Sequence, residues 1–224
     1  MNTKKIAIAI DGPAGAGKSS ISKVVANELG YLYIDTGAMY RGVTWAVLDS
    51  HVDVKNQKDV ESLLPSLDLT LEPTANACKV FVKGQDVTDL IRQQQINENV
   101  STIASYKGVR EYLVERQQAM AAVGGVILDG RDIGSVVLPK AELKIYLTAS
   151  ADARAKRRWL EVQGTSNEQS LEDIKKNVES RDEMDKNRVE SPLVCVEDAI
   201  VVDSSNMTFD ETVEHILHLV QERI

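Results

Sequence analysis

The sequence predicts an α/β fold, with a parallel sheet flanked by helices and a small antiparallel insert. Three observations lead to this prediction. Short β-branched runs recur along the 224 residues, helical patterns separate most of them, and one segment alternates with period two instead. Strands that alternate with helices are typical of a parallel sheet, whereas alternation of side chains with period two indicates hairpin strands.

The strands of the predicted sheet are the runs IAIAI, YLYID, GGVILDG, ELKIYLTAS and AIVVDSS, at residues 6–10, 31–35, 124–130, 142–150 and 199–205. Apolar residues follow a helical period at 18–29, 39–50, 108–122, 151–163, 170–187 and 208–223. IAIAI is uncharged, as expected of a central strand that is covered on both faces. Gly30 follows the first helix, where a left-handed C-cap would end it.

One segment breaks this rhythm. Residues 67–87, LDLTLEPTANACKVFVKGQDV, alternate with period two on either side of a polar turn. Two arrangements remain open, an elaboration on the edge of the main sheet or a separate subdomain spanning about 62–97. We favour the separate subdomain.

Composition and charge limit the class of protein. The formal net charge of −8 argues against general binding to nucleic acid or to an anionic membrane. Cys78 and Cys195 lie far apart and make no metal-binding spacing, so we expect both to be reduced. No signal-peptide pattern and no apolar run of about 20 residues occurs, so a cytoplasmic protein is expected.

The residues after the first strand carry the strongest motif. DGPAGAGKSS occupies 11–20, and Gly12 to Ser19 fit the P-loop spacing G-x-x-x-x-G-K-[ST]. Such a loop curls backbone N–H groups into an anion site at a helix N-terminus, with Lys18 for the outer phosphates and Ser19 for Mg²⁺. The alternative is a glycine-rich turn with a solvated lysine. The strand before and the helix after the motif favour a nucleoside-phosphate site.

Two further strand ends carry polar residues. In GVILDGRDIG (125–134), Asp129 ends an apolar run where it could hold Mg²⁺ through water, although an aspartate also commonly serves as a turn residue there. Arg131 and Asp132 follow it. The second strand end is that of YLYID (31–35), which is followed by Thr36, Tyr40 and Arg41. Ligands of open α/β sheets bind at this edge.

Arginines are the residues expected in a site for phosphoryl transfer, because guanidinium groups form bidentate hydrogen bonds with phosphate oxygens. The candidates are Arg41, Arg110, Arg131, Arg154, Arg157, Arg158, Arg181 and Arg188. Arg154 and Arg158 share a helix face with Arg157 beside them, which suits a lid that closes on ATP. Arg181, Asp185 and Arg188 also recur at helical spacing. For each of these charged helices, a solvated face is the alternative.

Together these motifs resemble the bacterial cytidylate kinases. IDGPAGAGKSS, DTGAMYR, the hairpin insert, LDGRDIG, the R-x-x-R-R lid and RDEMDKNR occur in that family's order and spacing. The resemblance implies a P-loop NTPase-type core (1–61, 98–150 and 188–224), an NMP-binding insert (62–97) and a helical lid with adjoining helices (151–187). It also implies transfer of the γ-phosphoryl group of ATP to CMP or dCMP, with Mg²⁺, by a monomer.

The resemblance implies a role for each matching residue. The catalytic residues would be Lys18, Arg131, Arg157 and Arg158. ATP would be bound by Gly12, Pro13, Ala14, Gly15, Ala16, Gly17, Lys18, Ser19 and Ser20, and Mg²⁺ by Ser19 and, through water, Asp129. CMP would be bound by Thr36, Tyr40, Arg41, Ser101, Arg110, Arg131, Asp132, Arg181, Asp185 and Arg188.

Within the CMP set, the resemblance also implies which part of the nucleotide each residue contacts. Arg131 and Arg188 would contact the α-phosphate, and Arg181 and Asp185 the ribose. Ser101, Arg110 and Asp132 would face the cytosine.

Two other functions remain open. One is a kinase of the same fold with another acceptor, such as UMP, AMP or a small alcohol. The other is a P-loop switch protein whose bound nucleotide governs a partner.

Overall fold

A five-stranded parallel sheet forms the centre of the molecule. The computed structural model describes residues 5–73, 78–165 and 168–224. The sheet order is β2-β6-β1-β7-β8, and the strands span Leu32–Asp35, Val126–Gly130, Ala7–Asp11, Leu143–Thr148 and Ile200–Asp203 respectively. All five predicted strands are present and every pairing is parallel, which confirms the predicted fold class.

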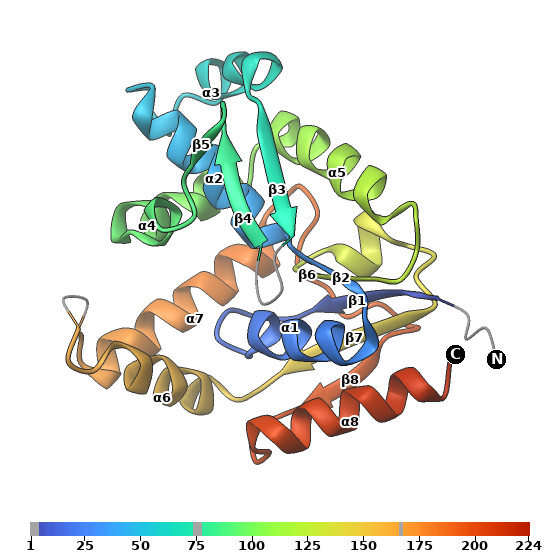
Figure 1. Cartoon of the computed structure of the whole chain (residues 1–224). Coiled ribbons are helices and arrows are strands. Elements are labelled where there is room, and N and C mark those ends of the chain that lie inside the picture. Colours follow the sequence, from blue (N-terminus) through green and yellow to red (C-terminus); the bar gives the residue numbers. More distant parts are fainter. Residues whose placement is uncertain (1–4, 74–77, 166–167) are drawn as a thin grey trace.

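Two hydrophobic clusters cover the two faces of this sheet. Successive side chains of a strand point to opposite faces, so Ala9 belongs to one cluster while Ile8 and Ile10 belong to the other. Helices α2 (Thr36–Asp49) and α5 (Lys107–Ala121) contribute to the first cluster. Helices α1 (Lys18–Leu29) and α8 (Phe209–Gln221) contribute to the second. Figure 1 shows α1 and α8 together on one side of the sheet.

The remaining helices lie around the carboxyl-terminal edge of the sheet and the insert. They are α3 (Gln57–Leu63), α4 (Gln94–Ile103), α6 (Ala151–Val162) and α7 (Leu171–Asn187). Short turns of other helix types occur at η1 (Leu64–Ser66), η2 (Leu90–Arg92) and η3 (Ile133–Val137), the last being π-helical. The six predicted helices are confirmed, while α3, α4 and η3 were not predicted.

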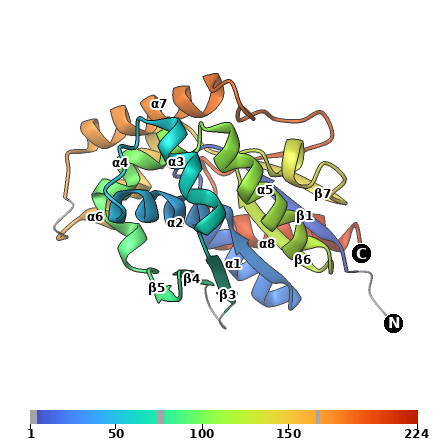
Figure 2. The same ribbon diagram turned by 90° about the horizontal axis from the view of Figure 1, so that it is seen from above.

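The insert is a separate three-stranded antiparallel sheet, so an elaboration on the edge of the main sheet is the wrong interpretation. Its strands are β3 (Leu69–Pro73), β4 (Cys78–Val82) and β5 (Gln85–Asp86). Residues 74–77, at the predicted turn, lie outside the described residues. The sheet packs on α2 so closely that a Cβ at Gly42 would lie 2.8 Å from Leu69 Cδ1. Figure 2 shows this sheet on the opposite side of the molecule from α7.

Both cysteines are free, as predicted. Cys78 is half-buried and its thiol donates to the carbonyl of Tyr33 at 3.1 Å, which ties β4 to β2. Burial raises the pKa of the Cys78 thiol to about 11, so this side chain is a packing group. Within the described part of the chain, no helix has the length and apolar character needed to cross a membrane.

Candidate active site

A cavity of about 300 Å³ lies where the carboxyl ends of β1, β2 and β6 meet helices α4, α6 and α7. Most of the predicted site residues line it. They are Ala14, Gly15, Ala16, Gly17, Lys18, Ser19, Ser20, Thr36, Tyr40, Arg41, Ser101, Arg110, Asp129, Arg131, Asp132, Arg157, Arg181, Asp185 and Arg188. Gly12, Pro13 and Arg158 are not among the lining residues. The topology therefore joins motifs that lie far apart in the sequence.

The P-loop connects β1 to α1 in a conformation that requires glycine. A Cβ at Gly12 would lie 1.9 Å from the carbonyl oxygen of Leu147, so the loop packs directly against the backbone of β7. Gly17 is the N-cap of α1 with φ of 87°, and it has no side chain to accept from the first-turn N–H groups. Those N–H groups and the helix dipole make this end of the cavity suited to an anion.

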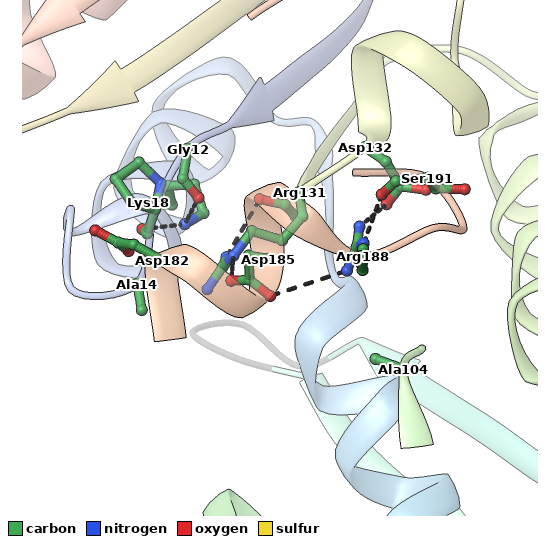
Figure 3. Close-up of polar contacts among 12 residues, drawn as sticks. Gly12, Ala14, Lys18, Ala104, Arg131, Asp132, Asp182, Asp185, Arg188 and Ser191 are labelled. Carbon is green, nitrogen blue, oxygen red and sulfur yellow. Dashed lines mark hydrogen bonds and ion pairs between the residues drawn. The ribbon is translucent and has the colours of Figure 1, made fainter. Parts of the chain in front are cut away.

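Lys18 is buried beneath this loop. Its Nζ donates to the carbonyl of Gly12 at 2.7 Å and to that of Pro13 at 2.8 Å, as Figure 3 illustrates. Burial, and after it the charge of Arg131, lowers the pKa of Lys18 well below its ordinary value. Gly12 and Pro13 thus hold the lysine through their carbonyl groups.

Asp129 lies beside Lys18 at the end of β6. Its carboxylate accepts hydrogen bonds from Ser19 Oγ at 2.9 Å and from the Tyr33 hydroxyl at 2.6 Å. Burial, followed by the charge of Asp35, raises the pKa of Asp129 to about 6. A buried carboxylate held by hydroxyl groups, next to a phosphate loop, provides the hard oxygen atoms that Mg²⁺ prefers. The residues present therefore fit a magnesium ion.

The opposite end of the cavity contains a buried cluster of arginines and aspartates. Asp132 forms an ion pair with Arg110, and both side chains are only 4% exposed. Arg188 Nη2 lies 3.8 Å from the other oxygen of Asp132, while Arg188 Nε donates to the carbonyl of Ser191 at 2.6 Å. The Arg110 guanidinium also lies over the ring of Tyr40, 5.3 Å from its centroid.

Asp185, on α7, lies beside two arginines of this cluster. It accepts from Arg131 Nε at 2.7 Å and lies 3.9 Å from Arg188 Nη1 (Figure 3). Arg181 Nε is buried and has no hydrogen-bond partner among the described residues. Burial, and after it the charge of Arg131, lowers the pKa of Arg181 to about 10. Four guanidinium groups thus gather around two carboxylates, an excess of positive charge that favours an anionic ligand.

Arg41 and Thr36 are held at the start of α2. Asp35 is the N-cap of that helix, where it accepts from Ala38 N at 2.8 Å and pairs with Arg41 Nη2 at 3.2 Å. Thr36 Oγ1 donates to the carbonyl of Asp129 at 2.7 Å. These contacts fix Arg41 at the rim of the cavity between its two ends.

The three lid arginines of α6 take different positions. Arg154 is buried, pairs with Asp182 on α7 through two hydrogen bonds of 3.1 and 2.6 Å, and donates to the carbonyl of Ala14 at 2.9 Å. Arg157 lines the cavity and donates to the carbonyl of Ser204 at 2.6 Å. Arg158 is half-exposed, pairs with Glu161 at 3.0 Å and is not brought into the cavity.

Several lining residues were not predicted, namely Asp35, Gly37, Val100, Ala104, Gly130 and Glu161. Asp35 ends a predicted strand, the same signal that identified Asp129, so this residue could have been found. Val100 and Ala104 lie in or next to the unpredicted helix α4, whose buried residues Ile96, Val100 and Ile103 carry a helical period. The sequence had no signal that Glu161, rather than Arg158, would line the cavity.

Comparison with known sequences gives long matches. A family model described as cytidylate kinase matches residues 8–222. A cytidylate kinase of Listeria monocytogenes serotype 4a (strain HCC23) is 46% identical over 222 residues, which cover 99% of each chain. One of Desulfitobacterium hafniense (strain Y51) is 45% identical over 221 residues, covering 99% of this chain and 95% of the relative.

Solved structures show a more distant likeness. An uncharacterized protein from Eubacterium ventriosum matches with a TM-score of 0.56 at 12% identity, covering 98% of this chain and 100% of the other. The protein TT1252 from Thermus thermophilus matches with a TM-score of 0.50 at 15% identity, covering 99% of both chains. At such low identity the likeness supports the fold alone.

The contact between Arg154 and Asp182 leads to a prediction about stability. In Arg154→Met the carboxylate of Asp182 would stay buried without its partner, which costs about 3–5 kcal/mol. Arg154→Met/Asp182→Leu, which removes both charges, should recover most of that loss. Thermal or urea unfolding would measure both. Lys176→Met breaks an exposed pair with Glu172 and, as the control, should change stability by less than about 1 kcal/mol. A single variant as stable as the wild type would contradict the role given to this pair.

Proposed function

The chain belongs to the cytidylate kinase family, and from that premise we propose how its residues carry out the reaction. It is an ATP-dependent nucleoside-monophosphate kinase, which transfers the γ-phosphoryl group of ATP to CMP or dCMP and gives ADP and CDP or dCDP. The match over residues 8–222 carries this conclusion. The cavity, with a phosphate loop at one end and an arginine–aspartate cluster at the other, supports it.

We assign the P-loop end of the cavity to ATP. The N–H groups of Gly15, Gly17 and the first turn of α1 would bind the β- and γ-phosphates, and Lys18 would move from the loop carbonyls toward the transferred group. Ser19 and, through water, Asp129 would hold Mg²⁺. When bound, this ion neutralises charge on the phosphate oxygens. The whole loop, Gly12 to Ser20, would form the ATP site.

We assign the arginine–aspartate cluster to CMP. Arg131 and Arg188 would hold the α-phosphate, with Thr36, Tyr40 and Arg41 at the rim. Ser101, Arg110 and Asp132 would face the cytosine, and Arg181 and Asp185 the ribose. This assignment is supported by the position of all ten residues on one cavity. It is also supported by the buried Nε of Arg181, which has no hydrogen-bond partner among the described residues.

The transfer itself needs little covalent help from the protein. An oxygen of the CMP phosphate attacks the γ-phosphorus of ATP, a new P–O bond forms, and the bond to the β-phosphate oxygen breaks with its electron pair leaving on ADP. No general base is required, because the second pKa of a phosphate monoester is about 6 and the oxygen is largely ionised at neutral pH. Lys18, Arg131 and Arg157 would align the two phosphates and offset their charge.

The division into core, NMP-binding insert and lid is part of the proposal, with the boundaries given by the resemblance. Arg157 already lies on the cavity, whereas Arg158 would reach it only if α6 rotated or closed. Closure would exclude water from the transferred group. A monomer is the expected state because a single chain contributes both ends of the cavity.

Measurement of phosphoryl transfer to a panel of acceptors tests the function. With ATP and Mg²⁺, we expect CMP and dCMP to be used far better than UMP, AMP or a small alcohol. Without an acceptor, ATP hydrolysis should be much slower than transfer. A protein that uses another acceptor best would be a different kinase of the same fold. Slow hydrolysis with tight nucleotide retention and no transfer would identify a switch protein instead.

Lys18→Ala should reduce kcat strongly, and far more than it disturbs folding. Some loss of stability is expected because the carbonyls of Gly12 and Pro13 lose their donor. Loss of one preorganised contact to the transferred phosphoryl group costs about 3–4 kcal/mol, or about 10²–10³ in kcat. Steady-state kinetics and thermal unfolding would be measured together. Lys107→Ala removes an exposed lysine paired with Glu111 and serves as the control. Near wild-type kcat in Lys18→Ala would contradict the assignment of the P-loop.

Asp132→Asn should narrow the preference for CMP over UMP. Cytosine offers an N4 amino donor where uracil offers an acceptor, and an ionised carboxylate can only accept. The amide of asparagine adds a donor that can reach O4 of uracil. We expect the ratio of kcat/KM for CMP to that for UMP to fall at least about tenfold, some 1.4 kcal/mol, with the KM for ATP little changed. An unchanged ratio would contradict this role of Asp132, and recognition of the base would then be assigned to Ser101 and Arg110.

A further inference from the structure

Asp11 is a buried carboxylate to which neither the sequence analysis nor the reaction assigns a role. It is the last residue of β1, directly before the P-loop, and it is only 6% exposed. Its two oxygens accept from two successive backbone N–H groups. Oδ1 accepts from Ile133 N at 2.8 Å, and Oδ2 accepts from Gly134 N at 2.7 Å.

These two N–H groups begin the π-helical turn Ile133–Val137, whose N-cap is Asp132. An aspartate at an N-cap ordinarily turns its own carboxylate back onto the N–H groups of the first turn. Asp132 does not, since it makes no side-chain cap hydrogen bond. Asp11, 122 residues before Ile133 in the chain, supplies the acceptors instead.

The consequence concerns the direction of the Asp132 carboxylate. Because Asp11 satisfies the N–H groups of the turn, the carboxylate of Asp132 points away from its own helix, toward Arg110 and Arg188 in the cavity. We propose that Asp11 is a positioning residue, which holds Asp132 in the orientation needed to read the pyrimidine base. This inference rests on the proposed role of Asp132 in binding CMP.

Close packing around the contact supports the proposal. A Cβ at Gly134 would lie 3.3 Å from Asp11 Oδ2 and 3.2 Å from Lys144 Cδ, so a methyl group there would press on both side chains. The stem of Lys144 covers the site, and its Nζ pairs outside with Asp198 at 2.7 Å. Burial raises the pKa of Asp11 to about 6, although the two backbone hydrogen bonds oppose this shift.

The position of Asp11 gives it a second consequence. Its backbone leads directly into Gly12 of the ATP-binding loop, while its side chain fixes the loop that carries Arg131 and Asp132. In the sheet it lies opposite Gly130 of β6. One residue therefore sets the spacing between the loop assigned to ATP and the loop assigned to CMP.

The test compares Asp11→Asn, Asp132→Asn and the double variant. In Asp11→Asn an amide N–H₂ replaces one oxygen, so one backbone N–H of the turn loses its acceptor and the turn must shift. We expect the CMP/UMP ratio of kcat/KM to fall at least fivefold. The double variant should have the ratio of Asp132→Asn alone, within twofold, because Asp11 acts through Asp132. Loss of fold stability alone would not change this ratio.

Asp53→Asn is the matched control. Asp53 is exposed and also accepts from a backbone N–H, that of Lys55 at 2.9 Å. Because Asp53 does not line the cavity, the CMP/UMP ratio of kcat/KM in Asp53→Asn should equal that of the wild type. If Asp11→Asn does not fold, Gly134→Ala replaces it, since the added methyl group would press on the same carboxylate. Gly134→Ala, if folded, should also lower the ratio.

The outcomes separate this inference from the proposed function. A wild-type protein that does not phosphorylate CMP would overturn the proposed function. If the wild type prefers CMP, a folded Asp11→Asn or Gly134→Ala protein with an unchanged ratio would overturn the inference alone. A double variant whose loss equals the product of the two single losses would also overturn it, because Asp11 would then act independently of Asp132.

Discussion

The crowding of more guanidinium groups than carboxylates, buried or half-buried, at one edge of the sheet is the constraint on which this site depends. The two carboxylates of this cluster are Asp132 and Asp185, and the guanidinium groups around them belong to Arg110, Arg131, Arg181 and Arg188. Removal of a charge from water is costly unless the charge is paired, so such a cluster persists only where packed elements hold it in place. On the proposed function, this excess positive charge would attract the phosphate of CMP, and the fold would hold it in place before the substrate binds.

The cost of taking these charges out of water is offset by contacts with groups outside the cluster. Arg188 donates to the carbonyl of Ser191, and Arg110 donates to that of Ala104 at 3.0 Å while lying over Tyr40. These two guanidinium groups thus satisfy part of their hydrogen bonding outside the cluster, while Arg110 Nε and Arg188 Nη2 are buried without a hydrogen-bond partner among the described residues. Because the anchoring groups are mostly backbone carbonyls, the positions of the arginines depend on the loops that carry them.

Local patterns explain what could be predicted from the sequence. The sheet followed from short apolar runs, the P-loop from its glycine spacing, and part of the cavity from residues at strand ends. The resemblance to the cytidylate kinases added Ser101 and gave the roles of Arg110, Arg181, Asp185 and Arg188. Residues whose role depends on a distant partner could not be predicted. Nothing near Asp11 in sequence indicates that it caps a turn at residue 133, and nothing in ADARAKRRWL indicates that Arg154 is buried on Asp182 while Arg158 faces solvent. The oligomeric state stays a prediction.

Helix α7 connects the two ends of the cavity through residues on one of its faces. Asp182 holds Arg154, which also donates to the P-loop carbonyl of Ala14, and Asp185, three residues later, holds Arg131. A displacement of α7 would therefore change contacts at the end of the cavity proposed for ATP and at the end proposed for CMP together, because a helix moves as a rigid element over so short a distance.

The same contacts restrict how the proposed lid could close. The first turn of α6 is fixed where Arg154 donates to the carbonyls of Ala149 and Ala14. Farther along, α6 packs on α7 through an apolar cluster formed by Ala155, Val162, Ile174 and Val178. Because that packing is buried, α6 and α7 would move as one unit if the proposed lid closes, with the largest displacement at the ends far from Arg154. Arg157 and Arg158, one turn beyond the anchor, are then the arginines that closure can carry toward the transferred phosphoryl group.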